Sequence, residues 1–180
     1  LISQAGALLA GVGIADESAV IAAAYKSLGR AIETGAQAGE ELDLTAADTL
    51  SDIIRDAAAI AGANSTQQST INSLSDDAAQ TTANLNQALE GASTDTGSTE
   101  DRLVQMAAVQ IVAEDIEDDM ETGAQNGDVG GTTTKTTGGA LINAIDAADN
   151  TVGDVDGDGD SDGVIDATPP TPPTPPAPPT

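Results

Sequence analysis

Proline is confined to one end of this chain, and its distribution limits what the rest can fold into. All eight prolines lie between Pro169 and Pro179, and residues 1–168 contain none. A proline inside a helix removes a backbone hydrogen bond and clashes with the preceding turn, at a cost of about 3 kcal/mol. Since the proline-free stretch also lacks a convincing alternation of apolar and polar residues, we predict an all-α fold.

Apolar residues at helical spacing, separated by glycines and capping residues, place the helices. We expect helices over residues 2–10, 17–33, 46–61, 65–90, 99–122 and 140–148, with a loop rich in Gly and Thr over 123–139. The expected N-terminal caps are Asp16, Thr45 with Asp48, Asn64 or Ser65, and Ser98 with Asp101. Short loops between four to five amphipathic helices predict an antiparallel bundle or a pair of helical hairpins.

The apolar stripes predict which side chains face the core. Along the four longest helices they are Ile21, Ala24, Leu28 and Ile32; Ala47, Leu50, Ile54, Ala57 and Ile60; Ile71, Leu74, Ala78, Leu85 and Leu89; and Leu103, Met106, Val109, Ala113, Ile116 and Met120. The sequence has neither Phe nor Trp, so the core must be built from small and aliphatic side chains. Tyr25, the one aromatic residue, is expected to be half-buried. We expect a marginally stable fold that depends on ions or neighbouring domains.

The charge excludes several classes of partner. Five basic and 30 acidic residues give a net charge of −25, which repels nucleic acid and disfavours anionic membrane surfaces. It also destabilises the compact state unless cations screen it. No apolar run approaches the roughly 18 residues of a membrane span. Residues 1–15 lack the basic start of a signal peptide, and because the sequence opens on Leu1 we expect a segment of a longer chain.

Catalysis has little support in the sequence. Histidine and cysteine are both absent, so the usual catalytic triads, thiolate metal sites and disulfides are unavailable. Paired carboxylates could serve a glycosidase, but sugar sites normally use aromatic platforms. We therefore expect a protein that is not an enzyme.

Aspartate alternates with glycine and small residues over 154–166, and this pattern suits calcium. Calcium takes six to eight oxygen ligands from closely spaced carboxylates and carbonyls, and glycine permits the tight turn around the ion. The predicted ligands are Asp154, Asp156, Asp158, Asp160, Asp162, Val164, through its carbonyl, and Asp166. Two overlapping registers fit, one beginning at Asp154 and the other at Asp158. An unliganded acidic linker is the alternative.

These 13 residues resemble the aspartate-rich loops of thrombospondin type 3 repeats, dockerins and EF-hands. The resemblance implies a calcium site, and the type 3 pattern Asp-x-Asp-x-Asp-Gly-x-x-Asp fits both registers. The chain departs from the EF-hand at the twelfth position, where Ile165 or Pro169 stands in place of a bidentate acid. Without that ligand, we expect a weak affinity of about 0.1–1 mM, as in extracellular modules.

The sequence divides into three parts. We expect an alanine-rich helical domain over 1–150, an irregular calcium-binding loop over 151–167, and a Pro/Thr linker in the polyproline II conformation over 168–180. This layout resembles segments of long secreted bacterial surface proteins of the haemolysin and adhesin kinds. That resemblance implies export, a place at the cell surface, and neighbouring domains in a longer chain.

A second group of acids lies near the end of the fifth predicted helix. Its members are Glu114, Asp115, Glu117, Asp118, Asp119 and Glu121. Three of them, Glu114, Asp118 and Glu121, share a helical face turned away from Ile116 and Met120. A solvated face is the simpler interpretation, and an auxiliary cation site is the alternative.

Three functions fit these observations. The first is a non-catalytic structural and interaction module of an extracellular multidomain protein, in which calcium stiffens the junction to the proline-rich linker. The second is an adhesin or dockerin-like binding module whose helical face docks a protein or glycan partner. A contiguous apolar patch on the helical surface would favour that second function. The third is an intracellular acidic helical protein of a salt-loving cell.

Overall fold

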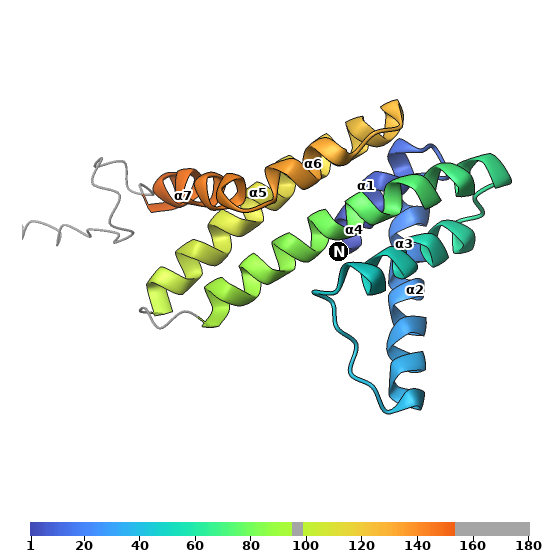
Figure 1. Ribbon diagram of the computed structural model, residues 1–180, viewed down its shortest axis with the longest axis horizontal. Helices are drawn as coiled ribbons and strands as arrows, with labels where there is room; N and C mark the ends of the chain where they lie inside the picture. Colours follow the sequence, from blue (N-terminus) through green and yellow to red (C-terminus); the bar gives the residue numbers. More distant parts are fainter. Residues whose placement is uncertain (95–98, 154–180) are drawn as a thin grey trace, which may run out of the picture.

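The structure, a computed structural model, describes residues 1–94 and 99–153, and this part of the chain is helical without any β-strand. Seven helices follow one another along it (Figure 1). They are α1 (Ile2–Gly11), α2 (Glu17–Ala38), α3 (Ala47–Ile60), α4 (Ser65–Thr94), α5 (Thr99–Asn126), α6 (Gly130–Lys135) and α7 (Gly139–Gly153). The prediction of an all-α fold is confirmed.

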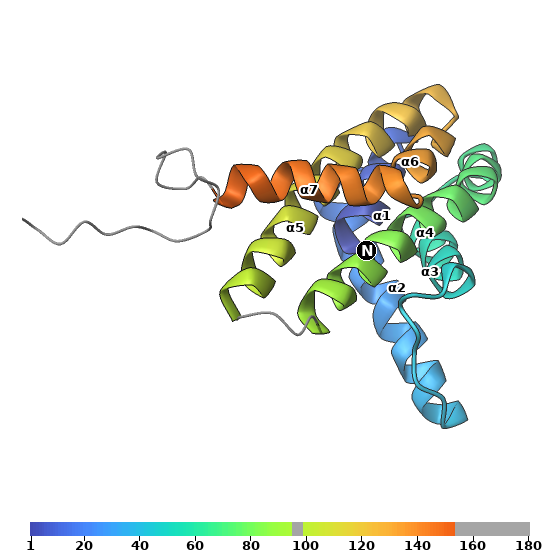
Figure 2. The same ribbon diagram turned by 60° about the vertical axis from the view of Figure 1, so that its left-hand side comes forward.

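The shortest of the early helices lies at the centre of the packing. α1 contacts α2, α3, α4 and α5, and its consecutive residues from Gln4 to Leu9 are all buried. A helix that is apolar on every side must be covered on every side, so α1 acts as the shared core element. α3 packs along α4, and α7 packs across α5 on the other side of the molecule (Figures 1 and 2).

The C-terminal half of α2 projects from the rest of the molecule. Figures 1 and 2 show it running out beside the segment 39–46, which returns the chain to α3. α2 ends at Ala38 and is capped by Gly39, whose φ of 74° is the left-handed conformation that glycine adopts readily. The sequence had suggested an end near residue 33, but Gly35 continues the helix.

Two of the predicted helix caps are confirmed. Asp16 Oδ1 accepts the Ala19 N–H at 2.9 Å at the start of α2. At the start of α4, Asn64 Oδ1 accepts the Gln67 N–H at 3.0 Å, and Gln67 Oε1 accepts the Asn64 N–H at 3.0 Å. This reciprocal pair is a capping box.

The predicted capping box of Thr45 and Asp48 is wrong. α3 begins after Ala46 without any side-chain cap. The Thr45 hydroxyl and N–H instead both donate to Asp43 Oδ1, at 2.6 and 2.8 Å. Aspartate readily accepts from the backbone two residues on, so Asp43 takes the hydroxyl that would have capped α3.

The core is aliphatic, as the composition requires. Its largest fully buried aliphatic side chains are Leu8, Leu9, Leu50, Ile54, Ile71, Met120, Val20 and Val129. Tyr25 is 62% exposed, which corrects the expectation that it is half-buried. The buried face of α2 is formed by Val20, Ala23, Ala24 and Ser27, whereas Ile32 is 52% exposed. The predicted α2 stripe is therefore turned partly away from the core.

A short helix replaces part of the predicted loop over 123–139. α5 continues to Asn126, and α6 follows after a turn in which Gly127 has a φ of 75°. Thr132 and Thr136 of α6 are buried. The Thr132 hydroxyl donates to the Val129 carbonyl, and the Thr136 hydroxyl donates to the Thr132 carbonyl. Packing against α4 explains why a sequence of low helix propensity is helical here.

Among the described helices, none combines the length and the apolar character needed to cross a bilayer.

Candidate functional site

The predicted calcium ligands follow directly after the last described helix. All of them lie outside the described residues, as does the Pro/Thr segment 168–180: Asp154, Asp156, Asp158, Asp160, Asp162, Val164 and Asp166. α7, which ends at Gly153, is the element from which this stretch of chain continues. The predicted calcium site therefore rests on the sequence pattern, and the packing of α7 determines where it begins.

α7 is held mainly by α5. Leu141 and Ala148 are each only 8% exposed, and alanines of α7 face Val112 and Ile116 of α5 across a cleft of about 480 Å³. Alanine contributes little transfer free energy per residue. α7 is thus held by close but modest packing, and its outer face includes Ile142, which is 60% exposed.

The second acidic group lies along α5 beside this cleft. Asp119 pairs with Lys135 of α6, while Ile116 and Met120 are buried. Glu114, Asp118 and Glu121 are exposed. Across the part of the chain that the structure describes, no three acidic side chains converge closely enough to hold a metal ion. One member of this group thus forms an ion pair that ties α6 to α5.

Acidic side chains also surround a cleft between α2 and α3. The cleft has a volume of about 560 Å³ and is lined by Glu40, Glu41, Asp43, Asp52 and Asp56 together with Arg30. Arg30 Nη1 lies 3.1 Å from Asp56 Oδ1, joining the two helices. Hydrogen bonds from the Thr45 hydroxyl and N–H lower the pKa of Asp43. The Asp43 carboxylate therefore stabilises the turn at the edge of the cleft.

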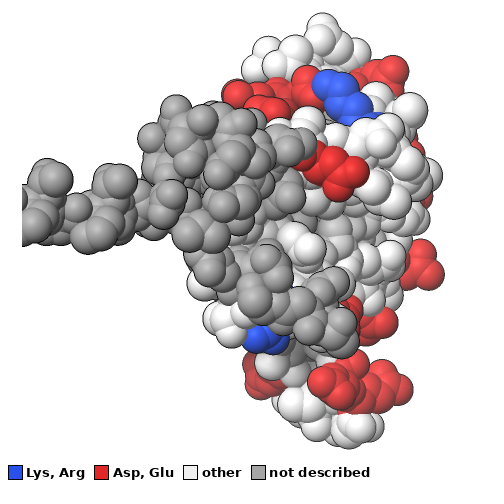
Figure 3. Space-filling model, turned by 90° about the vertical axis from the view of Figure 1, so that its left-hand side faces the viewer, with Lys and Arg blue, Asp and Glu red and all other residues white. Residues whose placement is uncertain are grey.

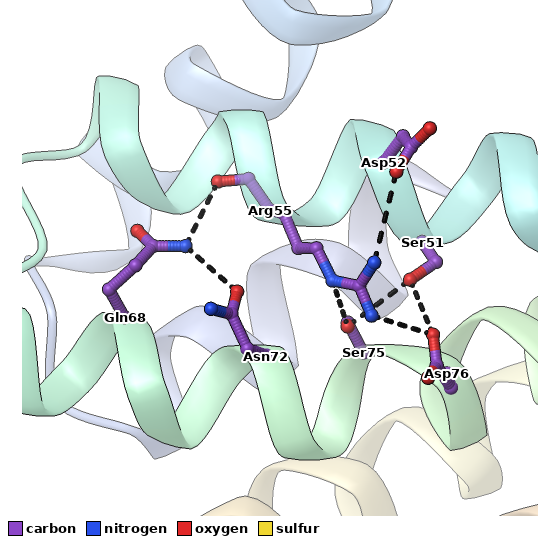
Figure 4. A network of polar contacts seen from close by, with 7 residues as sticks. All are labelled: Ser51, Asp52, Arg55, Gln68, Asn72, Ser75 and Asp76. Carbon is purple, nitrogen blue, oxygen red and sulfur yellow. Dashed lines mark hydrogen bonds and ion pairs between the residues drawn. The ribbon is translucent and has the colours of Figure 1, made fainter.

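A network of polar contacts joins α3 to α4 (Figure 4). Arg55 donates from Nε to Ser75 Oγ and from Nη2 to Asp76 Oδ1, both at 2.8 Å. Ser51 Oγ donates to the same carboxylate at 2.8 Å. The hydrogen-bonding groups of Arg55, Ser51, Ser75 and Asp76 bind one another. Such a network holds two helices together.

An apolar groove of about 490 Å³ opens where α4 and α5 meet the start of α1. Leu89 and Leu103 on its walls are 41% and 61% exposed, and Leu85 and Met106 lie deeper. Sequence patterning had placed Leu89 and Leu103 in the core, but the neighbouring helices leave them uncovered. The groove is an apolar surface that sequence reasoning missed.

Negative charge dominates the surface around these features. On the face drawn in Figure 3, acidic side chains are spread over the described surface, and basic ones are few. The apolar groove and the clefts therefore lie on a molecule that repels anions.

Comparison of the chain with models of protein families, with characterised proteins and with solved structures finds no significant match.

Proposed function

We propose that the chain is a non-catalytic structural and interaction module of an extracellular multidomain protein, in which calcium stiffens the junction between the helical part and a proline-rich linker. The observation that carries the proposal is the aspartate run 154–166, which begins directly after Gly153, the last residue of α7. The resemblance to thrombospondin type 3 loops supports calcium as the ligand.

The position of the run after a helix gives calcium its mechanical role. The C-terminal end of a helix carries partial negative charge, and closely spaced aspartates repel one another and that end. A bound cation neutralises the carboxylates and gathers them around itself. Without calcium, the chain after α7 would remain extended by repulsion; with calcium, its direction would be set relative to α7.

A non-catalytic role accords with the use of polar groups in the helical part. Arg55, Ser51 and Ser75 join α3 to α4, and Asp16 and Asp43 support helix starts and turns. The absence of His and Cys from the sequence removes the usual nucleophile and base pairs. The expected affinity of about 0.1–1 mM suits extracellular calcium, which supports a secreted or cell-surface location.

Calorimetric titration of the full chain with calcium tests the proposal. We expect binding in the range of about 0.1–1 mM, and we expect it to disappear when Asp156, Asp158, Asp160 and Asp162 are all replaced by Asn. The matched control replaces Glu114 and Glu121 by Gln and Asp115 and Asp118 by Asn, which removes the same charge from α5. Absence of heat from the wild-type chain at millimolar calcium would overturn the proposal, as would loss of binding in the control alone.

The stiffening is measured separately. Because the chain lacks cysteine, spin labels can be placed at Asn143→Cys on α7 and Ala167→Cys after the run. Calcium should narrow the distribution of distances between the two labels. An unchanged distribution in a chain that binds calcium would show that the ion has no mechanical role.

A binding module is the second candidate, and the groove between α4 and α5 favours it. Leu89 and Leu103 expose apolar surface on an otherwise acidic molecule, and a groove lined by Leu and Met suits an apolar helix face. No aromatic side chain of the described residues lines this groove, which makes a protein partner a better fit than a glycan. Leu103→Glu should abolish capture of such a partner, with Ile142→Glu as the control; equal loss in both would argue against the groove.

A further inference from the structure

α2 carries an apolar stripe that the fold leaves largely uncovered. Ile21, Tyr25, Leu28 and Ile32, here called the α2 seam, recur at intervals of four, three and four residues. Residues at this spacing lie on one face of a helix. Tyr25 is 62% and Ile32 is 52% exposed, and Ile21 and Leu28 are partly buried. Single exposed apolar residues are ordinary, but a continuous stripe indicates a contact surface.

The α2 seam lies beside the buried face of the helix rather than opposite it. α1 covers its first residue, because a Cβ on Gly6 would lie 3.3 Å from Ile21 Cγ1. The C-terminal half of α2 projects from the molecule, as Figures 1 and 2 show. The seam therefore begins where α2 packs on α1. It then extends along α2 to a part of the helix whose seam side is not covered by any described helix.

We propose that the α2 seam is the contact surface of a homodimer, in which α2 packs against α2 of a second copy in antiparallel orientation. The spacing is the first reason. Intervals of four, three and four read the same in both directions, so a two-fold axis between Lys26 and Ser27 places Ile21 opposite Ile32 and Tyr25 opposite Leu28 of the second copy. A symmetric interface requires this self-complementarity.

The charge distribution is the second reason. Residues 18–32 contain no acid and hold Lys26 and Arg30, two of the five basic residues of a chain with 30 acids. A second copy with a net charge of −25 is therefore repelled less along this segment than at the acid-lined cleft between α2 and α3, where Arg30 is paired with Asp56. The seam is flanked by Ala22 and Gly29 on one side and by Ala31 on the other. These small residues permit close approach of two helices and carry no carboxylate.

The antiparallel orientation follows from the position of the rest of the molecule. α2 is joined to the body at its N-terminal half and projects at its C-terminal half (Figure 1). A parallel pair would bring the two acidic bodies together at the same end. An antiparallel pair places them at opposite ends of the helix pair, where their repulsion is smaller, and also opposes the two helix dipoles.

The size of the contact predicts a weak, concentration-dependent dimer. One crossing of two helices covers less than the roughly 800 Å² per partner of a standard interface. The net charges of the two copies also repel at long range, and salt screens that repulsion. Association should therefore strengthen as salt is added, opposite to the behaviour of a dimer held by ion pairs.

Sedimentation velocity of the full chain over a concentration series, at low and high salt, tests the proposal. We expect the average mass to rise toward that of a dimer, more strongly at high salt. Ile32→Glu should weaken association by at least about tenfold, because it places an unpaired carboxylate in the apolar contact. Ile142→Glu on α7 is the matched control, since Ile142 is 60% exposed, and it should associate like the wild type. A wild-type chain that stays monomeric at high salt, or an Ile32→Glu chain that associates normally, would overturn the proposal.

Cysteine cross-linking tests the orientation in a chain that has no native cysteine. In the antiparallel pair, the two copies of residue 28 lie about 4.5 Å apart along the helix axis, and the two copies of residue 32 lie about 16 Å apart. Oxidation should therefore link Leu28→Cys chains and leave Ile32→Cys chains unlinked. Linking of both variants would show parallel pairing, and linking of neither would show that the seam is not the interface. Tyr25, the only aromatic residue, reports the same contact through a change in its fluorescence with concentration.

Discussion

The role of a glycine in this chain depends on what its backbone contacts in the fold, as Gly11 shows. The first helix is expected over residues 2–10, directly before Gly11. In the structure Gly11 is the last residue of α1 and also the point where α1 meets α5, because a Cβ there would lie 2.5 Å from the Glu121 carbonyl oxygen and 2.7 Å from Ala124 Cβ. Backbone cannot move aside as a flexible side chain can.

Gly11→Ala should therefore destabilise the protein. We expect a loss of about 1–3 kcal/mol in the free energy of unfolding, the range for an overpacked contact, measured by chemical denaturation. Gly91→Ala is the control, because nothing lies within 4 Å of a Cβ at that position in α4. Alanine there should be neutral or stabilise by roughly 0.5–1 kcal/mol. Equal effects of the two substitutions would contradict the close contact of α1 and α5.

Asp16 gives a pH dependence whose sign follows from its cap. Hydrogen bonds from the Ser18 hydroxyl and the Ala19 N–H lower the pKa of Asp16. A carboxyl with a lowered pKa stabilises the folded chain above its unfolded pKa of about 3.9, and loses that contribution as the pH falls through its folded pKa. Asp16→Ala should thus be less stable than the wild type at neutral pH, with a difference that shrinks below about pH 4.

Thermal unfolding of both proteins across this pH range measures the difference directly. Because the other acids titrate in both chains, their contributions largely cancel in the comparison. Asp16→Asn keeps an acceptor oxygen without a titrating group, so it should retain more stability than Asp16→Ala. A difference between wild type and Asp16→Ala that stays constant from neutral to acid pH would contradict the role of the carboxylate.

Among the helices, α6 depends most on its neighbours. Six residues of Gly, Thr and Lys are too few and too poor in helix formers to be stable alone. The Thr81 hydroxyl of α4 lies 3.1 Å from the hydroxyls of both Thr132 and Thr133, and Thr133 donates to the Asp77 carbonyl at 3.0 Å. Hydroxyl contacts with α4, rather than local preference, hold α6 in place.

Thr81→Val should loosen α6 while keeping the shape of the side chain. We expect a loss of about 1 kcal/mol, because the buried Thr132 hydroxyl loses a partner, and faster amide hydrogen exchange across residues 130–135. Thr70→Val on the exposed part of α4 is the control, since the Thr70 hydroxyl contacts only the Thr66 carbonyl of its own helix. Unchanged exchange in α6 of the Thr81→Val chain would show that these hydroxyls do not hold it.

Taken whole, the molecule must fold against its own charge. Within residues 1–94 and 99–153, few ion pairs offset the net charge of −25, and among them Arg30 with Asp56 and Arg55 with Asp76 join neighbouring helices. Both are partly exposed and contribute little individually. Screening of the remaining carboxylates should therefore matter more to stability than the loss of these pairs.

Added sodium chloride should raise the melting temperature, as followed by far-UV circular dichroism. Salt reduces repulsion among like charges over distances beyond about 10 Å at 0.1 M, whereas it would lower the melting temperature of a fold held mainly by ion pairs. Calcium should add a further increase at equal ionic strength, and this increase should vanish when Asp156, Asp158, Asp160 and Asp162 are replaced by Asn. A melting temperature that falls with salt would contradict the dominance of repulsion.

The helical class and most helix starts could be predicted from the residues alone. The absence of proline before residue 169, the Asp16 cap and the Asn64 cap act within a few residues, and backbone hydrogen bonds of a helix span only four. The α3 stripe was also predicted well, with Leu50, Ile54 and Ala57 fully buried. The candidate calcium ligands come from the sequence pattern alone and stay a prediction, since they lie outside the described residues.

Contacts between distant segments account for what the sequence could not supply. The Ser27 hydroxyl of α2 donates to the Ile53 carbonyl at 2.8 Å, on a buried face that includes Ala24 of the predicted stripe and leaves Tyr25 and Ile32 exposed. Gly11 meets Glu121, and Thr81 meets Thr132, across more than 50 residues of chain. Local patterning shows that a helix has an apolar face, but only the positions of its neighbours decide which part of that face is covered. The exposed α2 seam and the groove between α4 and α5 are therefore products of the packing.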